Sequence, residues 1–198
     1  MEPDVQAAKA ALRDELRQRL AAHHPDLARR AAALVAERVL ALPEVAAARR
    51  VFTCLSFGAE LDTMGLAERL LAGGREVYVP RADRADGCLH VHRYPCALET
   101  LSFGLRQPSP RAPEVPPDAV DATVDVALVL GLAFDRRGYR LGHGRGYFDR
   151  FLRDRPFPAV GLAFALQLRD RLPAEPHDVP MAVVVTEDET LRSGGAEV

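Results

Sequence analysis

Two segments near the start of the chain place apolar residues three or four positions apart. The first apolar stripe consists of Val5, Ala8, Leu12, Leu16 and Leu20. This spacing predicts an amphipathic helix over residues 5–20, with Asp4 as its N-cap. A second helix is predicted from Pro25 to the residue before Pro43. Its inward-facing residues are predicted to be Leu27, Ala31, Leu34, Val35 and Val39.

Beyond these helices, short apolar runs alternate with helical patterns. The runs that predict strands are 51–55, 76–80, 124–130, 159–164 and 181–185, with a hairpin arm at 88–92. Helices are predicted at 62–74 and 150–155, and the proline-rich segment 107–118 is expected to be an irregular surface loop. Buried strands linked by helices predict a three-layer α/β/α sandwich with a mainly parallel central sheet. The length favours a single domain over residues 1–198.

Composition narrows the class of protein. The net charge of −2 gives no basic field for nucleic-acid binding. The longest apolar stretch, Val124–Phe134, is far shorter than the ~20 residues of a membrane helix, and no signal-peptide pattern opens the chain. Three cysteines without C-x-x-C spacing fit a reducing compartment. We therefore expect a cytoplasmic monomer or weak homodimer that acts on a small molecule, without nucleic-acid or membrane partners.

Three glycines alternate where a buried strand leads toward a short helix. Gly142, Gly144 and Gly146 would let backbone amides approach an anion near the positive end of that helix. Residues 135–155 carry seven Arg and three Asp, a local +4 within a chain of −2. The segment predicts a phosphate-binding loop, and a merely tight surface connection is the alternative. It is not a Walker A loop, because no Gly-Lys-Ser/Thr ends it, and it is not a dinucleotide fingerprint, because Tyr147 stands where a third glycine would be needed.

Other charged residues are candidates for solvent-exposed or functional roles. Lys9, the only lysine among 26 basic residues, and Arg13 lie one helical turn apart, which most simply indicates a solvated helix face. Asp149 is either a helix-capping carboxylate or a magnesium ligand, and Asp178 could complete a metal pair.

Two further patterns bear on metal binding and on hydrolysis. Cys88, His90 and His92 alternate along a predicted strand at a spacing compatible with zinc, but three ligands without a fourth favour a structural role. A serine hydrolase is excluded because no Gly-x-Ser-x-Gly motif occurs.

These residues, taken in order, resemble the 5-formyltetrahydrofolate cyclo-ligase family over almost the whole chain. The early matches are Lys9-x-x-x-Arg13, then Leu55, Glu60 and Thr63, then Pro80-Arg81. The most specific block is Gly131-x-Ala133-Phe134-Asp135-x-x-Gly138-x-Arg140-Leu141-Gly142-x-Gly144-x-Gly146-Tyr147-x-Asp149. The last matches are Gly161-Leu162-Ala163-Phe164, Gln167, Leu172-Pro173, Asp178 and Thr186-Glu187.

The resemblance implies an enzyme that uses ATP and Mg²⁺ to close 5-formyltetrahydrofolate into 5,10-methenyltetrahydrofolate through a phosphorylated formyl intermediate, releasing ADP and phosphate. The residues implied to bind ATP are Lys9, Arg13, Arg140, Leu141, Gly142, His143, Gly144, Arg145, Gly146 and Tyr147. Arg145 and Tyr147 are the implied catalytic residues. The implied folate contacts are Leu55, Glu60, Tyr147 and Phe148, and the implied magnesium ligands are Asp149 and Asp178.

The chain departs from the family pattern at two positions. Phe148 stands where a second tyrosine is common, so a hydroxyl group is missing, and Ala182 stands where an acidic residue is often found. These departures motivate the alternative of a non-catalytic relative that binds folate or nucleotide. A sugar-phosphate isomerase on a similar fold is a more distant alternative, because it would have no reason to retain Lys9.

Overall fold

A computed structural model describes residues 5–193. The helices are α1 (Val5–Ala21), α2 (Pro25–Ala41), α3 (Pro43–Ala46), α4 (Met64–Ala72), α5 (Val120–Thr123) and α6 (Tyr147–Leu152). The strands are β1 (Arg50–Thr53), β2 (Glu76–Ala82), β3 (Leu89–Tyr94), β4 (Leu98–Thr100), β5 (Arg106–Pro108), β6 (Val126–Leu130), β7 (Ala133–Asp135), β8 (Arg140–Leu141), β9 (Ala159–Leu162), β10 (Leu168–Arg169), β11 (Val183–Val185) and β12 (Thr190–Arg192). No described helix is long and apolar enough to cross a membrane.

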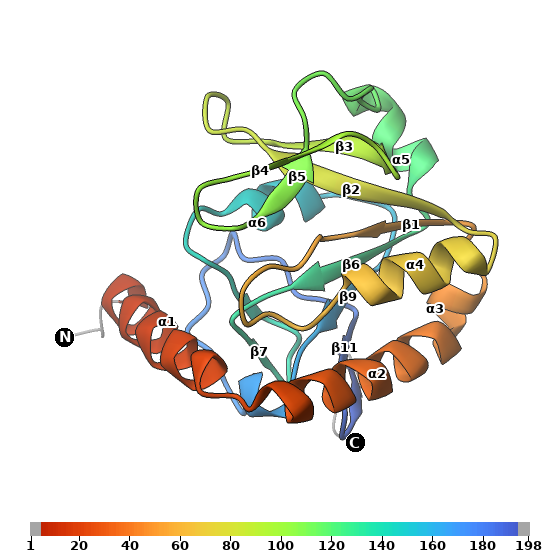
Figure 1. Ribbon diagram of the computed structural model, residues 1–198. Coiled ribbons are helices and arrows are strands. Elements are labelled where there is room, and N and C mark those ends of the chain that lie inside the picture. Colours follow the sequence, from red (N-terminus) through yellow and green to blue (C-terminus); the bar gives the residue numbers. More distant parts are fainter. Residues whose placement is uncertain (1–4, 194–198) are drawn as a thin grey trace.

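A seven-stranded sheet forms the centre of the molecule, in the order β12-β11-β9-β6-β1-β2-β3 (Figure 1). Its five inner strands are parallel, and the two edge strands β3 and β12 run antiparallel to their neighbours. All five residues of β6 are buried, as expected of a strand covered on both faces. The predicted parallel crossover from β1 through α4 to β2 and the hairpin arm at β3 are confirmed.

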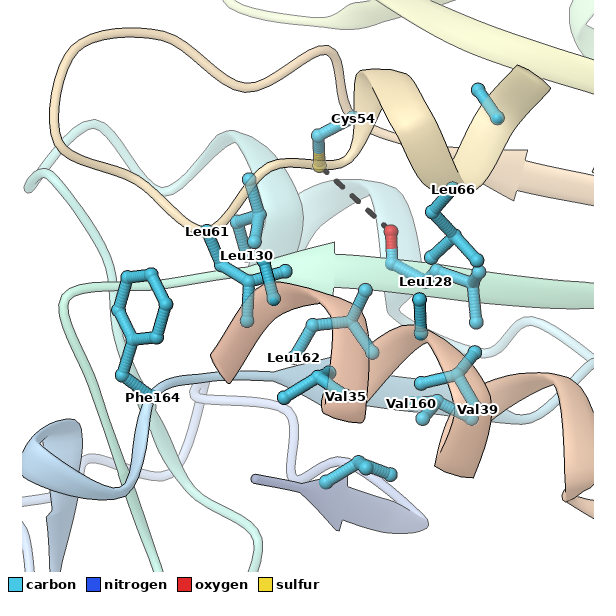
Figure 2. Close-up of a cluster of buried hydrophobic side chains, with 14 of the residues drawn as sticks. Val35, Val39, Cys54, Leu61, Leu66, Leu128, Leu130, Val160, Leu162 and Phe164 are labelled. Atoms are coloured by element: carbon cyan, nitrogen blue, oxygen red, sulfur yellow. Dashed lines mark hydrogen bonds between the residues drawn. The ribbon is translucent and has the colours of Figure 1, made fainter. Parts of the chain in front are cut away.

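Helices cover both faces of this sheet, which confirms the predicted three layers. On one face, Val35 and Val39 of α2 pack against β-strand residues such as Leu128 and Val160 (Figure 2). On the other face, α5 and α6 lie over a second apolar cluster that contains Phe52, with Phe52 stacked on Phe151 at 4.7 Å between ring centroids. The alternation of side chains along each strand therefore feeds two separate cores.

The first two helices form where the spacing predicted them, but the buried faces differ in detail. Leu27 and Leu34, predicted to face inward, are 56% and 53% exposed. The buried stripe of α2 is Ala31, Ala32, Val35, Ala36 and Val39, so the two leucines lie at its flank. In α1, Lys9 is buried and Ala8 is exposed, because only the second half of the helix reaches the apolar core. Asp4, the predicted N-cap, lies outside the described residues.

Two predicted boundaries were wrong, at the glycine loop and at the proline-rich segment, and one hairpin was not predicted. The helix predicted at 150–155 is α6, which begins three residues earlier, directly after Gly146 in a left-handed conformation. A short hairpin, β7 with β8, precedes the loop and was not predicted. Segment 107–118 begins inside β5 rather than as a loop. Gln107 is buried there, and its side chain forms hydrogen bonds to Ala82 of β2 and Glu99 of β4.

Candidate active site

A cleft with a volume of about 430 Å³ opens at the carboxyl ends of β1, β2 and β6. Cys54 and Leu55 follow β1, Leu130 ends β6, and Pro80 and Ala82 belong to β2. Binding crevices are common at this edge of parallel sheets, because loops diverge there around a rigid base. The opposite wall of the cleft is the glycine loop with the first turn of α6.

The cleft brings together most residues of the sequence-based site. Those that line it are Leu55, Glu60, Arg140, Gly142, His143, Arg145, Gly146, Tyr147, Phe148 and Asp149. The predicted residues that do not line it are Lys9, Arg13, Leu141, Gly144 and Asp178. The first group contains the predicted folate contacts and most of the glycine loop. In the second group, Gly144 belongs to the loop, Leu141 precedes it, and the other three residues come from other segments of the chain.

The glycine loop is held from two sides by arginines. Arg13 of α1 donates from Nε to the carbonyl oxygen of Gly142 at 3.0 Å. Gly144 has a φ of +100°, which favours glycine, and a Cβ there would lie only 3.3 Å from the Arg13 guanidinium. Arg150 donates to the carbonyl oxygens of Arg145 at 3.0 Å and Gly87 at 2.6 Å. These contacts attach the glycine loop to α1 and to the segment around Gly87.

Leu141 is the predicted loop residue whose side chain faces away from the cleft. It is 2% exposed and belongs to the apolar core. Its carbonyl oxygen accepts a 2.7 Å hydrogen bond from the amide of Leu132. Leu141 therefore anchors the start of the glycine loop to the hairpin beneath it.

At the inner end of the cleft, Arg140 and Asp149 form a buried ion pair. Arg140 Nη2 lies 3.0 Å from Asp149 Oδ1, and the arginine side chain is 1% exposed. Burial lowers the pKa of Arg140, and the charge of Asp149 opposes that shift. The Arg140 guanidinium also lies 5.4 Å from the ring centroid of Phe148. The pair therefore fixes the side chains at the base of the cleft.

Lys9 lies in a second charged cluster, whose pairing of Lys9 with two carboxylates was not predicted from the sequence. Its Nζ contacts Asp178 Oδ2 at 2.6 Å and Glu175 Oε2 at 2.8 Å. Burial alone would lower the pKa of Lys9, but the hydrogen bonds to both carboxylates outweigh it and the pKa is raised. Hydrogen bonding to Lys9 also lowers the pKa of Glu175. Lys9 is thus neither a solvated face residue nor part of the cleft wall.

A backbone hydrogen bond links the segments that carry the two predicted metal ligands, Asp149 and Asp178. Asp149 Oδ1 accepts a 3.4 Å hydrogen bond from the amide of Val179, the residue that follows Asp178. Glu175, His177 and Asp178 place their donor atoms within 4.8 Å of one another, the one such group within residues 5–193. Cys88, His90 and His92 do not form such a group: His90 bonds Asp86 and Glu114, and His92 bonds the carbonyl of Pro113. Their structural interpretation is therefore favoured over zinc binding.

Glu60 and His143 connect the loop after β1 to the glycine loop. Glu60 accepts from the amide of Phe57 at 3.1 Å, and its other oxygen lies 3.1 Å from His143 Nε2. The ring of Phe57 packs edge-on against Phe103, with ring centroids 5.6 Å apart. The sequence reasoning missed both phenylalanines, since nothing in the pattern signals that residues 46 positions apart share a wall.

Three arginines on the cleft have no carboxylate partner among residues 5–193: Arg84, Arg106 and Arg145. They are exposed, and each comes from a different element: the turn after β2, the start of β5, and the glycine loop. The cleft lining holds four arginines and two carboxylates, a surplus of two positive charges when histidine is neutral. A positive cleft in a chain of net charge −2 attracts anionic ligands.

Cys54 lies at the base of the cleft, but its thiol is not suited to nucleophilic chemistry. Burial raises its pKa to about 12, so the thiol stays protonated near neutrality. Its Sγ lies 3.8 Å from the carbonyl oxygen of Leu128, as the dashed line in Figure 2 shows. Cys54 therefore acts as a small apolar side chain in the cleft floor.

A three-layer α/β/α fold with a positive glycine-loop cleft defines a class of anion-binding α/β proteins. The profile of the 5-formyltetrahydrofolate cyclo-ligase family matches residues 5–187. The chain is 33% identical to the 5-formyltetrahydrofolate cyclo-ligase of Escherichia coli over 86% of this chain and 96% of that protein. It is 39% identical to the enzyme of the same name from Mycolicibacterium smegmatis over 70% and 73% of the two chains.

Solved structures lead to the same group of proteins. The NMR structure of Aquifex aeolicus 5,10-methenyltetrahydrofolate synthetase superposes with a TM-score of 0.80 and 29% identity, covering 96% of this chain and 95% of that one. The chain therefore belongs to the 5-formyltetrahydrofolate cyclo-ligase family, and it is an enzyme of that family.

Proposed function

We propose that the protein converts 5-formyltetrahydrofolate to 5,10-methenyltetrahydrofolate while ATP becomes ADP and phosphate. The observation that carries the proposal is one cleft that joins an arginine-flanked glycine loop to an apolar pocket lined by Leu55, Phe57 and Tyr147. The loop suits a polyphosphate, and the pocket suits a flat ring system. A shared cleft would hold the formyl group within reach of the terminal phosphate.

The proposed chemistry solves a leaving-group problem. A formamide oxygen leaves poorly, so the formyl oxygen first attacks the γ-phosphorus and ADP departs. The second folate nitrogen then attacks the formyl carbon, loses its proton, and phosphate leaves with the former formyl oxygen. Phosphoryl transfer of this kind requires positioning and charge neutralisation more than covalent participation by the protein.

Arg145 and Arg13 are the proposed phosphate ligands on opposite sides of the loop. Arg145 is exposed on the loop and has no carboxylate partner within residues 5–193, so its guanidinium is available to the transferred phosphoryl group. Arg13 donates from Nε to the carbonyl oxygen of Gly142, and its guanidinium lies beside Gly144. Gly142, His143, Gly144 and Gly146 would surround the phosphates with backbone amides. Lys9, whose charge is shared with Asp178 and Glu175, would contact the phosphates from behind the loop.

Asp149 and Asp178 have the donor chemistry that Mg²⁺ requires. Both offer carboxylate oxygens, the ligands this ion prefers, and the Asp149–Val179 hydrogen bond keeps their segments adjacent. Each has one oxygen on a protein cation, Arg140 or Lys9, which leaves its second oxygen for a metal. The ion would supply charge neutralisation beside the phosphates. In this proposal the protein cations hold the carboxylates in place before the metal arrives.

The apolar half of the cleft is the proposed folate pocket. Glu60 is fixed by the amide of Phe57 and by His143, so its carboxylate is positioned to accept hydrogen bonds from N–H groups of a pterin ring. Tyr147 donates its hydroxyl to the carbonyl oxygen of Asp83 at 3.1 Å, which leaves the ring face rather than the hydroxyl for the folate. Phe148 lines the pocket without a hydroxyl and packs beside Arg140.

The experiment that tests this function is a direct assay. Purified protein is incubated with 5-formyltetrahydrofolate, ATP and Mg²⁺, and the absorbance of the methenyl product is followed. Product formation that requires both ATP and Mg²⁺ is the expected result. Tight folate binding with no turnover would instead favour the non-catalytic relative that the Phe148 departure suggests.

A further inference from the structure

Arg84 and Arg106 lie on the cleft wall formed by the sheet rather than on the glycine loop. Arg84 follows Asp83, whose carbonyl oxygen accepts from Tyr147, so Arg84 begins next to the pocket ring. Arg106 opens β5 and precedes the buried Gln107. Both arginines are exposed and neither has a carboxylate partner within the described part of the chain.

Gln107 holds the two arginine-bearing segments together. Its side-chain oxygen accepts from the amide of Ala82 at 3.2 Å, two residues before Arg84, and its side-chain nitrogen donates to Glu99 at 2.9 Å. Arg106 and Gln107 both line the cleft, where Gln107 is buried and Arg106 is exposed. A polar side chain that is 4% exposed thus fixes the relative placement of two exposed cations.

The surroundings of these arginines are apolar. Leu89, Leu101 and Leu105 line the cleft between the turn after β2 and β5. Apolar walls weaken solvent screening, so a carboxylate that enters here interacts more strongly with a guanidinium than it would on an open surface. Arginine also matches the planar carboxylate with paired N–H donors.

We propose that Arg84 and Arg106 form a carboxylate subsite, separate from the phosphate loop, that binds the glutamate end of the folate substrate. The inference rests on the proposed function, because the substrate supplies the carboxylates. A ligand with a flat ring at one end and a dicarboxylate at the other fits a cleft whose apolar middle separates two sets of unpaired arginines. Arg145 serves the phosphates, and Arg84 with Arg106 selects the substrate.

The test compares two substrates in matched variants. Steady-state kinetics are measured for 5-formyltetrahydrofolate and for 5-formyltetrahydropteroate, which lacks the glutamate, with the intact chain, Arg84→Gln, Arg106→Gln and the double variant. Arg111→Gln is the control, since Arg111 is also exposed but does not line the cleft. Melting temperatures establish that every variant is folded.

For the full substrate, each single variant should raise KM about tenfold, the lower range for a charged hydrogen bond, with kcat and the KM for ATP unchanged. For the truncated substrate, the variants should match the intact chain, whose KM is already raised. Equal losses on both substrates, or no loss on the full substrate, would overturn the subsite.

A failure of the proposed function gives a different result. If the intact chain turns over neither substrate, the affinities of the two compounds, measured by calorimetry, still test the subsite. Tighter binding of the glutamate form, lost in the double variant and retained in Arg111→Gln, would support it without catalysis. Equal affinity of the two compounds, or no binding of either, would overturn it.

Discussion

The cationic side chains at the inner end of the cleft are paired with carboxylates, whereas those at its rim are not. At the inner end, Arg140 is paired with Asp149, and just behind the loop Lys9 is paired with Asp178 and Glu175. At the rim, Arg84, Arg106 and Arg145 are exposed and have no carboxylate partner within residues 5–193. The same chain therefore neutralises its buried cations and leaves its exposed cleft cations available.

The difference follows from the cost of burying charge. A buried guanidinium or ammonium loses its water shell and needs a carboxylate to compensate. An exposed arginine is solvated, so it needs no carboxylate partner and can bind an anionic ligand. The paired inner end is consequently a rigid base, and the unpaired rim is where ligand anions contribute binding energy. Substitutions at the base should therefore reduce stability, whereas substitutions at the rim should reduce ligand binding.

The largest effect is expected from breaking the inner pair. Arg140→Met leaves Asp149 without its cation in a mostly buried position, and loss of one partner of a buried pair costs about 3–5 kcal/mol. The free energy of unfolding from urea denaturation measures this. Arg145→Gln at the rim is the matched control, with an expected change below about 0.5 kcal/mol. Equal losses in the two variants would remove the distinction between base and rim.

Replacing Lys9 tests whether this second paired cation also contributes to ATP binding. Lys9→Met should raise the KM for ATP about a hundredfold, because one phosphate contact and the placement of Asp178 are lost together. The KM for 5-formyltetrahydrofolate should stay unchanged. Because Lys9 is 5% exposed and doubly paired, the variant should also melt at a lower temperature. An unchanged KM for ATP in a folded variant would reduce Lys9 to a structural residue.

Phe148 offers a smaller change on the cleft wall. Phe148→Tyr adds a hydroxyl to a side chain that is partly exposed in the cleft, at no cost in ring packing. If that hydroxyl reaches the formyl group or phosphate, kcat should rise by about fivefold, which corresponds to roughly 1 kcal/mol. Stopped-flow measurement of product formation gives the comparison. A lower kcat would mean that the phenylalanine suits this cleft better than tyrosine.

The smallest effect is expected at the paired His90, which does not line the cleft. Hydrogen bonding to Glu114, aided by Asp86, raises the pKa of His90 above its usual 6.5. The protonated form is therefore stabilised in the folded state, so its contribution is complete below pH 6.5 and is lost as pH rises through the raised pKa. His90→Gln should cost about 0.5 kcal/mol at pH 5.5 and less at pH 8.5. A cost that is independent of pH would contradict the assignment.

Local patterns were sufficient to predict most of the fold. Apolar runs located β1, β2, β6, β9 and β11, and the alternating glycines located the loop that frames the cleft. These features depend on neighbouring residues, so spacing reveals them. The β7–β8 hairpin was missed because its strands are only three and two residues long.

The candidate site was harder to predict where it depends on long-range contacts. Lys9 meets Glu175 across 166 positions, and no local pattern marks Glu175 as its partner. The aromatic wall of Phe57 with Phe103 and the bridge from Gln107 to Ala82 have the same character.

In the proposed reaction, ATP and 5-formyltetrahydrofolate bind in one cleft, and the γ-phosphoryl group of ATP is transferred to the formyl oxygen. The most direct measurement uses 5-formyltetrahydrofolate labelled with ¹⁸O in the formyl group, followed by mass spectrometry of the phosphate released with ATP present. The account predicts one ¹⁸O atom in each phosphate formed. Phosphate without label, alongside normal formation of the methenyl product, would contradict it.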